Sequence, residues 1–136
     1  SGRMLGSISL NKIYIGQDIS EIHIREGNKI IEFLRANGIS LRAYLSQRNI
    51  LQSTGEYECL FTCPPYSDKE QWLEVPSDKR MCDDWIDECL KRFRCNKYLF
   101  VVDNTEKYKD YIVDEISNKS HLNHNSEYII MIQKYN

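Results

Sequence analysis

The segment YECLFTCPPY, residues 57–66, joins an apolar run to two consecutive prolines. The run lies between Gly55 and Pro64, a pattern that predicts a buried β-strand. Each proline restricts its own φ angle and lacks a backbone N–H, and the residue before a proline is held extended. The strand is therefore expected to end in a rigid turn whose carbonyl groups have few local donors.

Strand and helix patterns alternate on either side of this segment. Apolar strands are expected at 12–19, 40–45, 97–103 and 127–132. Helices are expected from the N-cap Ser20 to a stop at Gly38, over 81–94, and from Thr105 to Ile116. Strands separated by single helices predict βαβ crossovers, so the fold class is α/β with a mainly parallel sheet. A length of 136 residues corresponds to a single domain, 1–136.

The composition is that of an ordinary globular protein, with 41% apolar and 28% charged residues. No apolar run approaches the roughly 18 residues of a membrane helix, so no membrane partner is expected. The net charge of −2 gives no global basic field for nucleic acid. Residues 1–50 nevertheless hold seven basic against four acidic side chains. If the chain meets DNA or RNA, this half is expected to make the contact.

The cysteines predict thiols in a reducing compartment. There are five, at positions 59, 63, 82, 89 and 95, in a chain without an apolar signal core. None of the spacings is the C-x2-C pair of a zinc site, so no metal is expected. Cys59, Cys82 and Cys89 are interpreted as small core residues.

Two strand ends carry residues whose side chains are suited to ligand binding or catalysis. Ligands of parallel α/β folds bind beyond such strand ends. One strand ends near Asp18, and the other ends in the run Cys63, Pro64, Pro65 and Tyr66. Fixed carbonyl acceptors beside an aromatic ring suit a planar ring that carries an amino group. The alternative is a structural Pro-Pro loop with a packed tyrosine.

Three segments resemble motifs of one enzyme family. FTCPPY at 61–66 resembles the (D/N/S)-P-P-(Y/F/W) motif of the amino-methylating DNA methyltransferases. KIYIGQDIS at 12–20 resembles the second strand of that family, and SGRMLGS at 1–7 resembles the end of its glycine-rich first motif, as in phage and bacterial enzymes. SHLNHNSEYIIMI at 120–132 resembles the closing hairpin, so the resemblance covers nearly the whole chain in the family's order.

The resemblance implies a Rossmann-like sheet and an S-adenosylmethionine-dependent methyltransferase. It implies that the target is an exocyclic amino group of adenine or cytosine in DNA, flipped out of the duplex. Asp18 would hold the ribose hydroxyls, with Ile19 and Gly2 as further cofactor contacts. The catalytic residues implied are Cys63, Pro64, Pro65 and Tyr66. Such an enzyme would act in the cytoplasm, in a bacterium or as a phage or virus protein in its host.

Two departures from the family pattern shape these expectations. The chain begins inside the first motif, so the first strand and most of the glycine-rich loop are expected to be absent. The missing strand would be supplied by a longer chain, a partner or a homo-oligomer, or would leave a gap or a rearranged sheet. Cys63 also stands where the family has Asp, Asn or Ser, and a thiol is the weaker acceptor. Covalent catalysis by Cys63 is disfavoured, because the cysteine of carbon-5 cytosine methyltransferases follows its proline.

Two other functions remain open. The first is a catalytically inactive module for binding or assembly, which both departures favour. The second is an RNA or protein amino-methyltransferase with the same tetrapeptide.

The remaining polar candidates have structural interpretations. The histidines at 23, 121 and 124 are expected on the surface or in loops. Trp72 and Glu74 follow the prolines, where packing and substrate contact are equally consistent with the sequence. Basic residues near the end of the helix at 81–94 are expected to complement the helix dipole.

Overall fold

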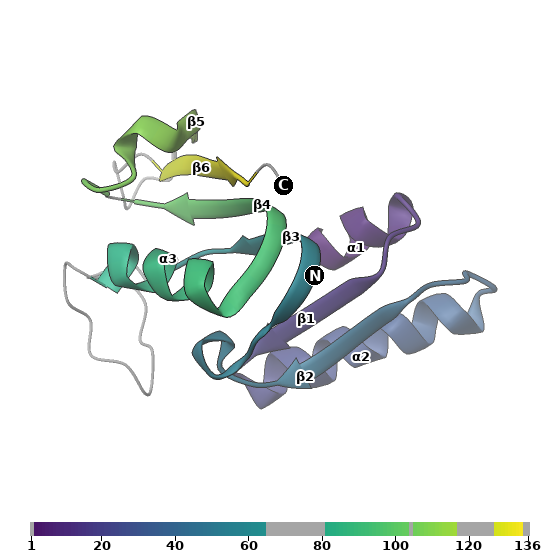
Figure 1. The fold of residues 1–136 in the computed structure, drawn as a ribbon. Coiled ribbons are helices and arrows are strands. Elements are labelled where there is room, and N and C mark those ends of the chain that lie inside the picture. The colour runs from purple at the N-terminus through teal and green to yellow at the C-terminus, as the bar shows by residue number, and fades with distance from the viewer. Residues whose placement is uncertain (1, 65–80, 104, 117–126, 135–136) are drawn as a thin grey trace, which may run out of the picture. The chain divides into compact units, whose positions relative to one another are not determined.

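The structure is a computed structural model that describes residues 2–64, 81–103, 105–116 and 127–134. The chain divides into two compact units, Ser1–Ser53 and Thr54–Asn136, each with its own sheet (Figure 1). This division leaves the single-domain prediction untested. The combination of helices with parallel strand pairs confirms the α/β class.

The first unit is built from two helices and a two-stranded parallel sheet. In chain order, its main elements are α1 (Gly2–Ser9), β1 (Tyr14–Asp18), α2 (Glu21–Ala36) and β2 (Ala43–Gln47). Tyr14 lies opposite Ala43 at one end of the β1–β2 pair, and Asp18 lies opposite Gln47 at the other. A short 3-10 helix at Ile50–Gln52 follows β2.

The core of the first unit joins α1, α2 and β2. Met4, Ile31 and Ala43 are buried together, and half-buried apolar side chains pack around them. Gly27 of α2 lies against Leu45 of β2, because a Cβ atom at position 27 would stand 2.5 Å from the Cδ1 atom of Leu45. The glycine thus weakens the helix locally but permits a close approach of α2 to the sheet.

Both predicted ends of α2 are confirmed. The Ser20 side chain accepts a hydrogen bond from the backbone N–H of His23 at 3.3 Å, which makes Ser20 the N-cap. Gly38 follows the C-cap residue Asn37 with a φ of +80°, the left-handed conformation that glycine adopts without strain. The start of α2 is therefore fixed directly beyond the end of β1.

The second unit holds a mixed four-stranded sheet and one helix. Its main elements are β3 (Gly55–Thr62), α3 (Met81–Arg92), β4 (Phe93–Val102), β5 (Ile112–Ile116) and β6 (Glu127–Gln133). The strand order is β3-β4-β6-β5, with β3 parallel to β4 and with β6 antiparallel to both of its neighbours. The sheet is therefore parallel on one side and closed by antiparallel pairs on the other.

The predicted amphipathic helix at 81–94 is confirmed as α3, although Phe93 already belongs to β4. The apolar face of α3 and alternate residues of β4 and β6 form the core of this unit. The fully buried side chains include Ile86, Cys89, Tyr98, Phe100 and Ile130. Cys59, by contrast, is exposed on β3, so its assignment to the core is wrong. The side chain of Cys82 lies outside the described residues.

The helix predicted from Thr105 to Ile116 is not formed. Only a short 3-10 helix at Lys109–Tyr111 is present, and residues 112–116 form β5 instead. Thr105 does accept the backbone N–H of Tyr108 at 3.4 Å, so the expected cap exists but opens a turn. Branched residues such as Ile112 and Val113 favour strands, and pairing of Ile112 with Ile130 of β6 overrides the helical spacing.

Within the described residues, β1 pairs only with β2, and β3 pairs only with β4. Each is thus an edge strand of its sheet, while the absence of a further strand from the fold stays a prediction.

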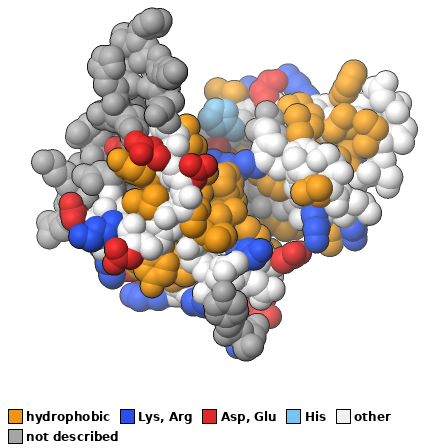
Figure 2. Space-filling model, turned by 90° about the horizontal axis from the view of Figure 1, so that it is seen from above, with side chains coloured by type: hydrophobic (Ala, Val, Ile, Leu, Met, Phe, Trp, Pro, Cys, Tyr) orange, Lys and Arg blue, Asp and Glu red, His pale blue; other side chains and the backbone are white. Residues whose placement is uncertain are grey.

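Large apolar side chains also reach the surface, among them Phe33 at 67% and Tyr44 at 58% exposure. Figure 2 shows hydrophobic side chains between charged ones on one face of the molecule. None of the described helices has the length and apolarity of a membrane span.

Candidate functional site

Asp18 is held at the carboxyl end of β1 by the neighbouring strand. Its carbonyl oxygen accepts the backbone N–H of Arg48 at 3.0 Å, which extends the ladder beyond Gln47. The side chain of Gln47 donates to the carbonyl oxygen of Ile19 at 3.1 Å. The carbonyl groups of Asp18 and Ile19 therefore both accept hydrogen bonds from the β2 segment, which holds the turn from β1 into α2 in place.

The carboxylate of Asp18 has two polar partners at the start of α2. Its Oδ1 atom accepts the backbone N–H of Ser20 at 2.8 Å. Its Oδ2 atom lies 3.2 Å from Nδ1 of His23, whose ring is 71% exposed. The Asp18 side chain is itself 43% exposed, and each carboxylate oxygen has capacity for more than one hydrogen bond. The group can therefore accept hydroxyl donors from a ligand without losing its protein partners.

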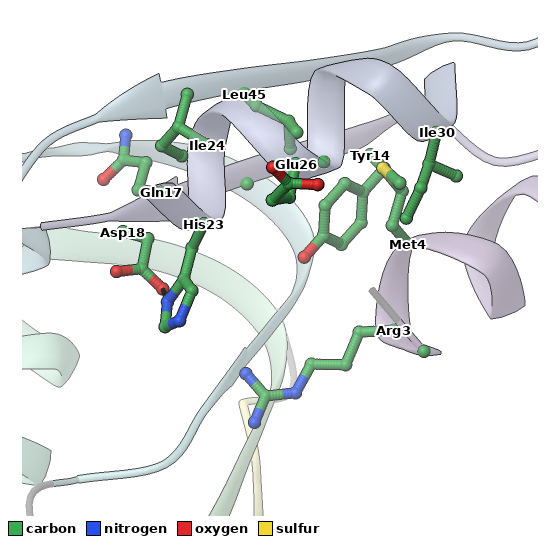
Figure 3. Close-up of a pocket in the computed structure, with 13 residues that line it drawn as sticks. Arg3, Met4, Tyr14, Gln17, Asp18, His23, Ile24, Glu26, Ile30 and Leu45 are labelled. Atoms are coloured by element: carbon green, nitrogen blue, oxygen red, sulfur yellow. Dashed lines mark hydrogen bonds and ion pairs between the residues drawn. The ribbon is translucent and has the colours of Figure 1, made fainter. Parts of the chain in front are cut away.

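A cavity of about 640 Å³ opens beside this carboxylate, within the usual range for small-molecule sites. Gly2 and Arg3 of α1, Asp18 of β1, and His23 of α2 belong to its lining. Its apolar wall includes Met4, Ile24 and Leu45. Figure 3 shows Asp18 and His23 turned toward one another, with the Tyr14 hydroxyl directed into the space beside them.

The cavity carries groups of both charges. Arg3 supplies a positive charge, and the carboxylates of Asp18 and Glu26 supply negative charges, with Glu26 paired to Lys29 at 3.0 Å. Burial raises the pKa of Tyr14, Arg3 opposes this shift, and Asp18 adds to it. Tyr14 is therefore a neutral phenol at neutral pH and offers a hydroxyl donor inside the cavity.

The three predicted cofactor residues have different positions. Gly2 and Asp18 line the same cavity, although they come from different elements and stand 16 positions apart in the sequence. Ile19 is half-buried in the turn after β1 and is not part of the cavity lining. The structure thus brings two of the three together, and the third directly follows Asp18 but lies outside the cavity lining.

The predicted catalytic run begins directly after β3 in the second unit. Thr62 is the last residue of β3 and lies opposite Phe100 of β4. Cys63 is half-buried and Pro64 is fully buried, whereas Pro65 and Tyr66 lie outside the described residues. Because β3 and β4 are parallel, Cys63 and Asp103 follow strands that end at the same edge of the sheet. The strand end is therefore located, and the roles predicted for these four residues stay predictions.

The prediction that His23 lies on the surface is confirmed, since its ring is 71% exposed, but its contact with Asp18 was not predicted. One signal was available, since His23 is the third residue of the helix that Ser20 caps, where side chains commonly reach back past the N-cap. The residues Trp72, Glu74, His121 and His124 lie outside the described residues. Lys91 and Arg92 lie in the last turn of α3, as predicted, and Arg92 also pairs with Glu88 at 3.1 Å.

No group of three potential metal ligands occurs in the described parts of the chain. The thiols of the second unit are poorly suited to nucleophilic chemistry where they are buried. Burial raises the pKa of Cys89 to about 12, and Glu88 adds to this shift. Burial likewise raises the pKa of Cys95 and of the more exposed Cys59.

The fold resembles that of a solved structure. It is the "putative methylase HI0767" from Haemophilus influenzae, with a TM-score of 0.58 and 10% sequence identity. The match covers 96% of this chain and 79% of that one, so it includes both units. No protein-family model matches the chain, and no curated protein matches it in sequence. The chain therefore shares its fold with that protein.

Proposed function

We propose that the chain is an S-adenosylmethionine-dependent methyltransferase whose target is an exocyclic amino group of adenine or cytosine in DNA. The observation that carries the proposal is the cavity at the end of β1, which gathers Asp18 and Gly2 as the motif resemblance requires. The likeness of the fold to a protein named as a methylase supports it.

The residues of the cavity fit the cofactor. A carboxylate at a strand end can accept both hydroxyl groups of a ribose, and both oxygens of Asp18 retain acceptor capacity. The apolar wall around Ile24 and Leu45 suits a purine ring, and Arg3 is a counter-charge for a carboxylate. When bound, S-adenosylmethionine supplies a methyl group on a positively charged sulfur.

The run after β3 would position the acceptor. Pro64 is buried in the structure, so its carbonyl oxygen would have to become accessible to accept one hydrogen of the target amino group, and the Cys63 side chain would be a second, weaker acceptor. Together they would direct the lone pair of the nitrogen toward the methyl group, so that an N–C bond forms as the S–C bond breaks. S-adenosylhomocysteine would leave as the neutral thioether, and the nitrogen would release one proton to water. Tyr66 stacks on the flipped base. In this scheme catalysis is mostly positioning, and no protein nucleophile is required.

The experiment is methyl transfer from radiolabelled cofactor to DNA oligonucleotides, with RNA of the same sequence as a competing substrate. We expect label on an amino nitrogen in DNA. We also expect Tyr66→Ala to weaken binding of the target base by about 1–3 kcal/mol, through the loss of base stacking. Label in RNA alone would show that the substrate is RNA and not DNA. Absence of transfer together with absence of cofactor binding would contradict the proposal.

A second candidate is an inactive methyltransferase-like module for binding or assembly. The cysteine at position 63 favours it, because the family has Asp, Asn or Ser there. Cofactor binding without transfer to DNA, RNA or protein would support this candidate over the enzyme.

A further inference from the structure

We propose that His23 is a positioning residue, which orients the Asp18 carboxylate toward the two hydroxyl groups of a ribose. This inference rests on the proposed function, because it concerns the same cavity. It adds a residue that neither the strand-end motif nor the fold comparison assigns.

The contact between the two side chains defines the direction of the hydrogen bond. Nδ1 of His23 lies 3.2 Å from Oδ2 of Asp18. An ionised carboxylate is an acceptor only, so Nδ1 carries the hydrogen and donates. The backbone N–H of Ser20 donates to Oδ1 from the other side, at 2.8 Å. Each oxygen of the carboxylate therefore has one protein donor, and its rotation is restrained at both ends.

The position of His23 is itself fixed by the start of α2. Its backbone N–H donates to the Oγ atom of Ser20 at 3.3 Å, so the residue that caps the helix also anchors the histidine. Asp18, Ser20 and His23 thus form a closed set of three contacts around the turn. The set faces a cavity rather than the unit's core, since both Asp18 and His23 belong to the cavity lining.

This arrangement matters for recognition of a diol. Two neighbouring hydroxyl groups need two acceptor oxygens at a fixed separation and orientation, and a freely rotating carboxylate presents them only part of the time. Without His23, Oδ2 would lose its protein donor and the carboxylate would keep only the Ser20 contact. We therefore expect His23 to sharpen discrimination between ribose and deoxyribose.

The test compares the dissociation constants of adenosine and 2′-deoxyadenosine for the full chain, measured by NMR titration. Wild-type protein should prefer adenosine by about tenfold to a hundredfold, because 2′-deoxyadenosine lacks one of the two hydroxyl groups that donate to the Asp18 carboxylate. His23→Ala should reduce that preference by about threefold to tenfold, and His23→Asn, which keeps a donor near the Nδ1 position, should restore it. Glu21→Ala is the matched control, because Glu21 lies in the same helical turn outside the cavity lining and should leave the preference unchanged.

A purely structural role for His23 would lower thermal stability without changing the preference for adenosine. His23→Leu provides a second variant without a donor if the alanine variant does not fold. A folded alanine or leucine variant that keeps the full wild-type preference would overturn the inference and leave the proposed function intact. If the wild-type chain shows no preference for adenosine, the proposed ribose site would itself be refuted, and the proposed role of His23 with it.

Discussion

The backbone N–H of Ser20 donates to Oδ1 of Asp18 over 2.8 Å, so the candidate ribose-binding side chain also satisfies a backbone donor at the start of α2. A residue at this position therefore affects two properties, ligand binding and local stability. The two contributions can be separated because an asparagine oxygen accepts the same N–H but carries no charge.

Asp18→Ala should weaken cofactor binding by about 1–3 kcal/mol, since charged hydrogen bonds to the ribose are lost. It should also lower the free energy of unfolding by about 1 kcal/mol through the lost Ser20 contact. Asp18→Asn should weaken binding but unfold close to wild type. Calorimetric titration and urea unfolding measure the two effects, and unchanged affinity in a folded alanine variant would remove Asp18 from the site.

Cys63→Ser tests the direct mechanism in the second unit. A hydroxyl is a better acceptor than a thiol, so the variant should keep or raise the rate of methyl transfer to an amino nitrogen. Covalent catalysis predicts the reverse, with a nearly inactive serine variant. The measurement is the single-turnover rate on DNA, and a trapped adduct between Cys63 and DNA would contradict the direct mechanism.

Gly38→Ala tests the C-terminal end of α2, where Gly38 follows the C-cap residue Asn37. The φ of +80° at Gly38 is unfavourable for a residue with a Cβ atom, so the variant should lose about 1–2 kcal/mol of unfolding free energy. Gly6→Ala is a matched control, because Gly6 lies within α1 with open space around its Cβ position. That control should gain up to about 1 kcal/mol, and equal effects of the two changes would contradict the assigned cap.

The buried thiol of Cys89 predicts a loss of stability in alkaline solution. Burial raises its pKa from an ordinary value of 9.0 to about 12. Between these values the unfolded thiol releases its proton and the folded thiol retains it, so the free energy of unfolding falls as pH rises, by at most about 1.4 kcal/mol per pH unit. Urea unfolding of wild type and Cys89→Ala from pH 8 to 11 measures the difference. Parallel pH profiles for the two proteins would refute the prediction.

Local signals predicted the parts of the fold that depend on few residues. The cap at Ser20 and the stop at Gly38 follow from the chemistry of single residues, and the cap starts α2 directly after Asp18, the last residue of β1, and Ile19. The cavity around Asp18 was not predictable in the same way, because α1 contributes Gly2 and Arg3 to it through tertiary packing.

The wrong helix prediction at residues 105–116 has a clear physical origin. The spacing of Tyr108, Ile112 and Ile116 fits a helix, but pairing with β6 determines the structure of residues 112–116. Here a non-local partner decided the outcome, and single-sequence periodicity does not record such partners. The contact of His23 with Asp18 is different, because it spans only five positions and lies within reach of local reasoning about the start of α2.

The most direct test of the central claim is an NMR titration of the ¹⁵N-labelled chain with S-adenosylmethionine, which also detects weak binding. We expect the largest shifts at the amide groups of Gly2, Asp18 and His23, with smaller changes in the rest of α1. In Asp18→Asn the same set should shift only at higher ligand concentration. Shifts that avoid these residues, or that are identical in the variant, would contradict the assignment of the cavity as the cofactor site.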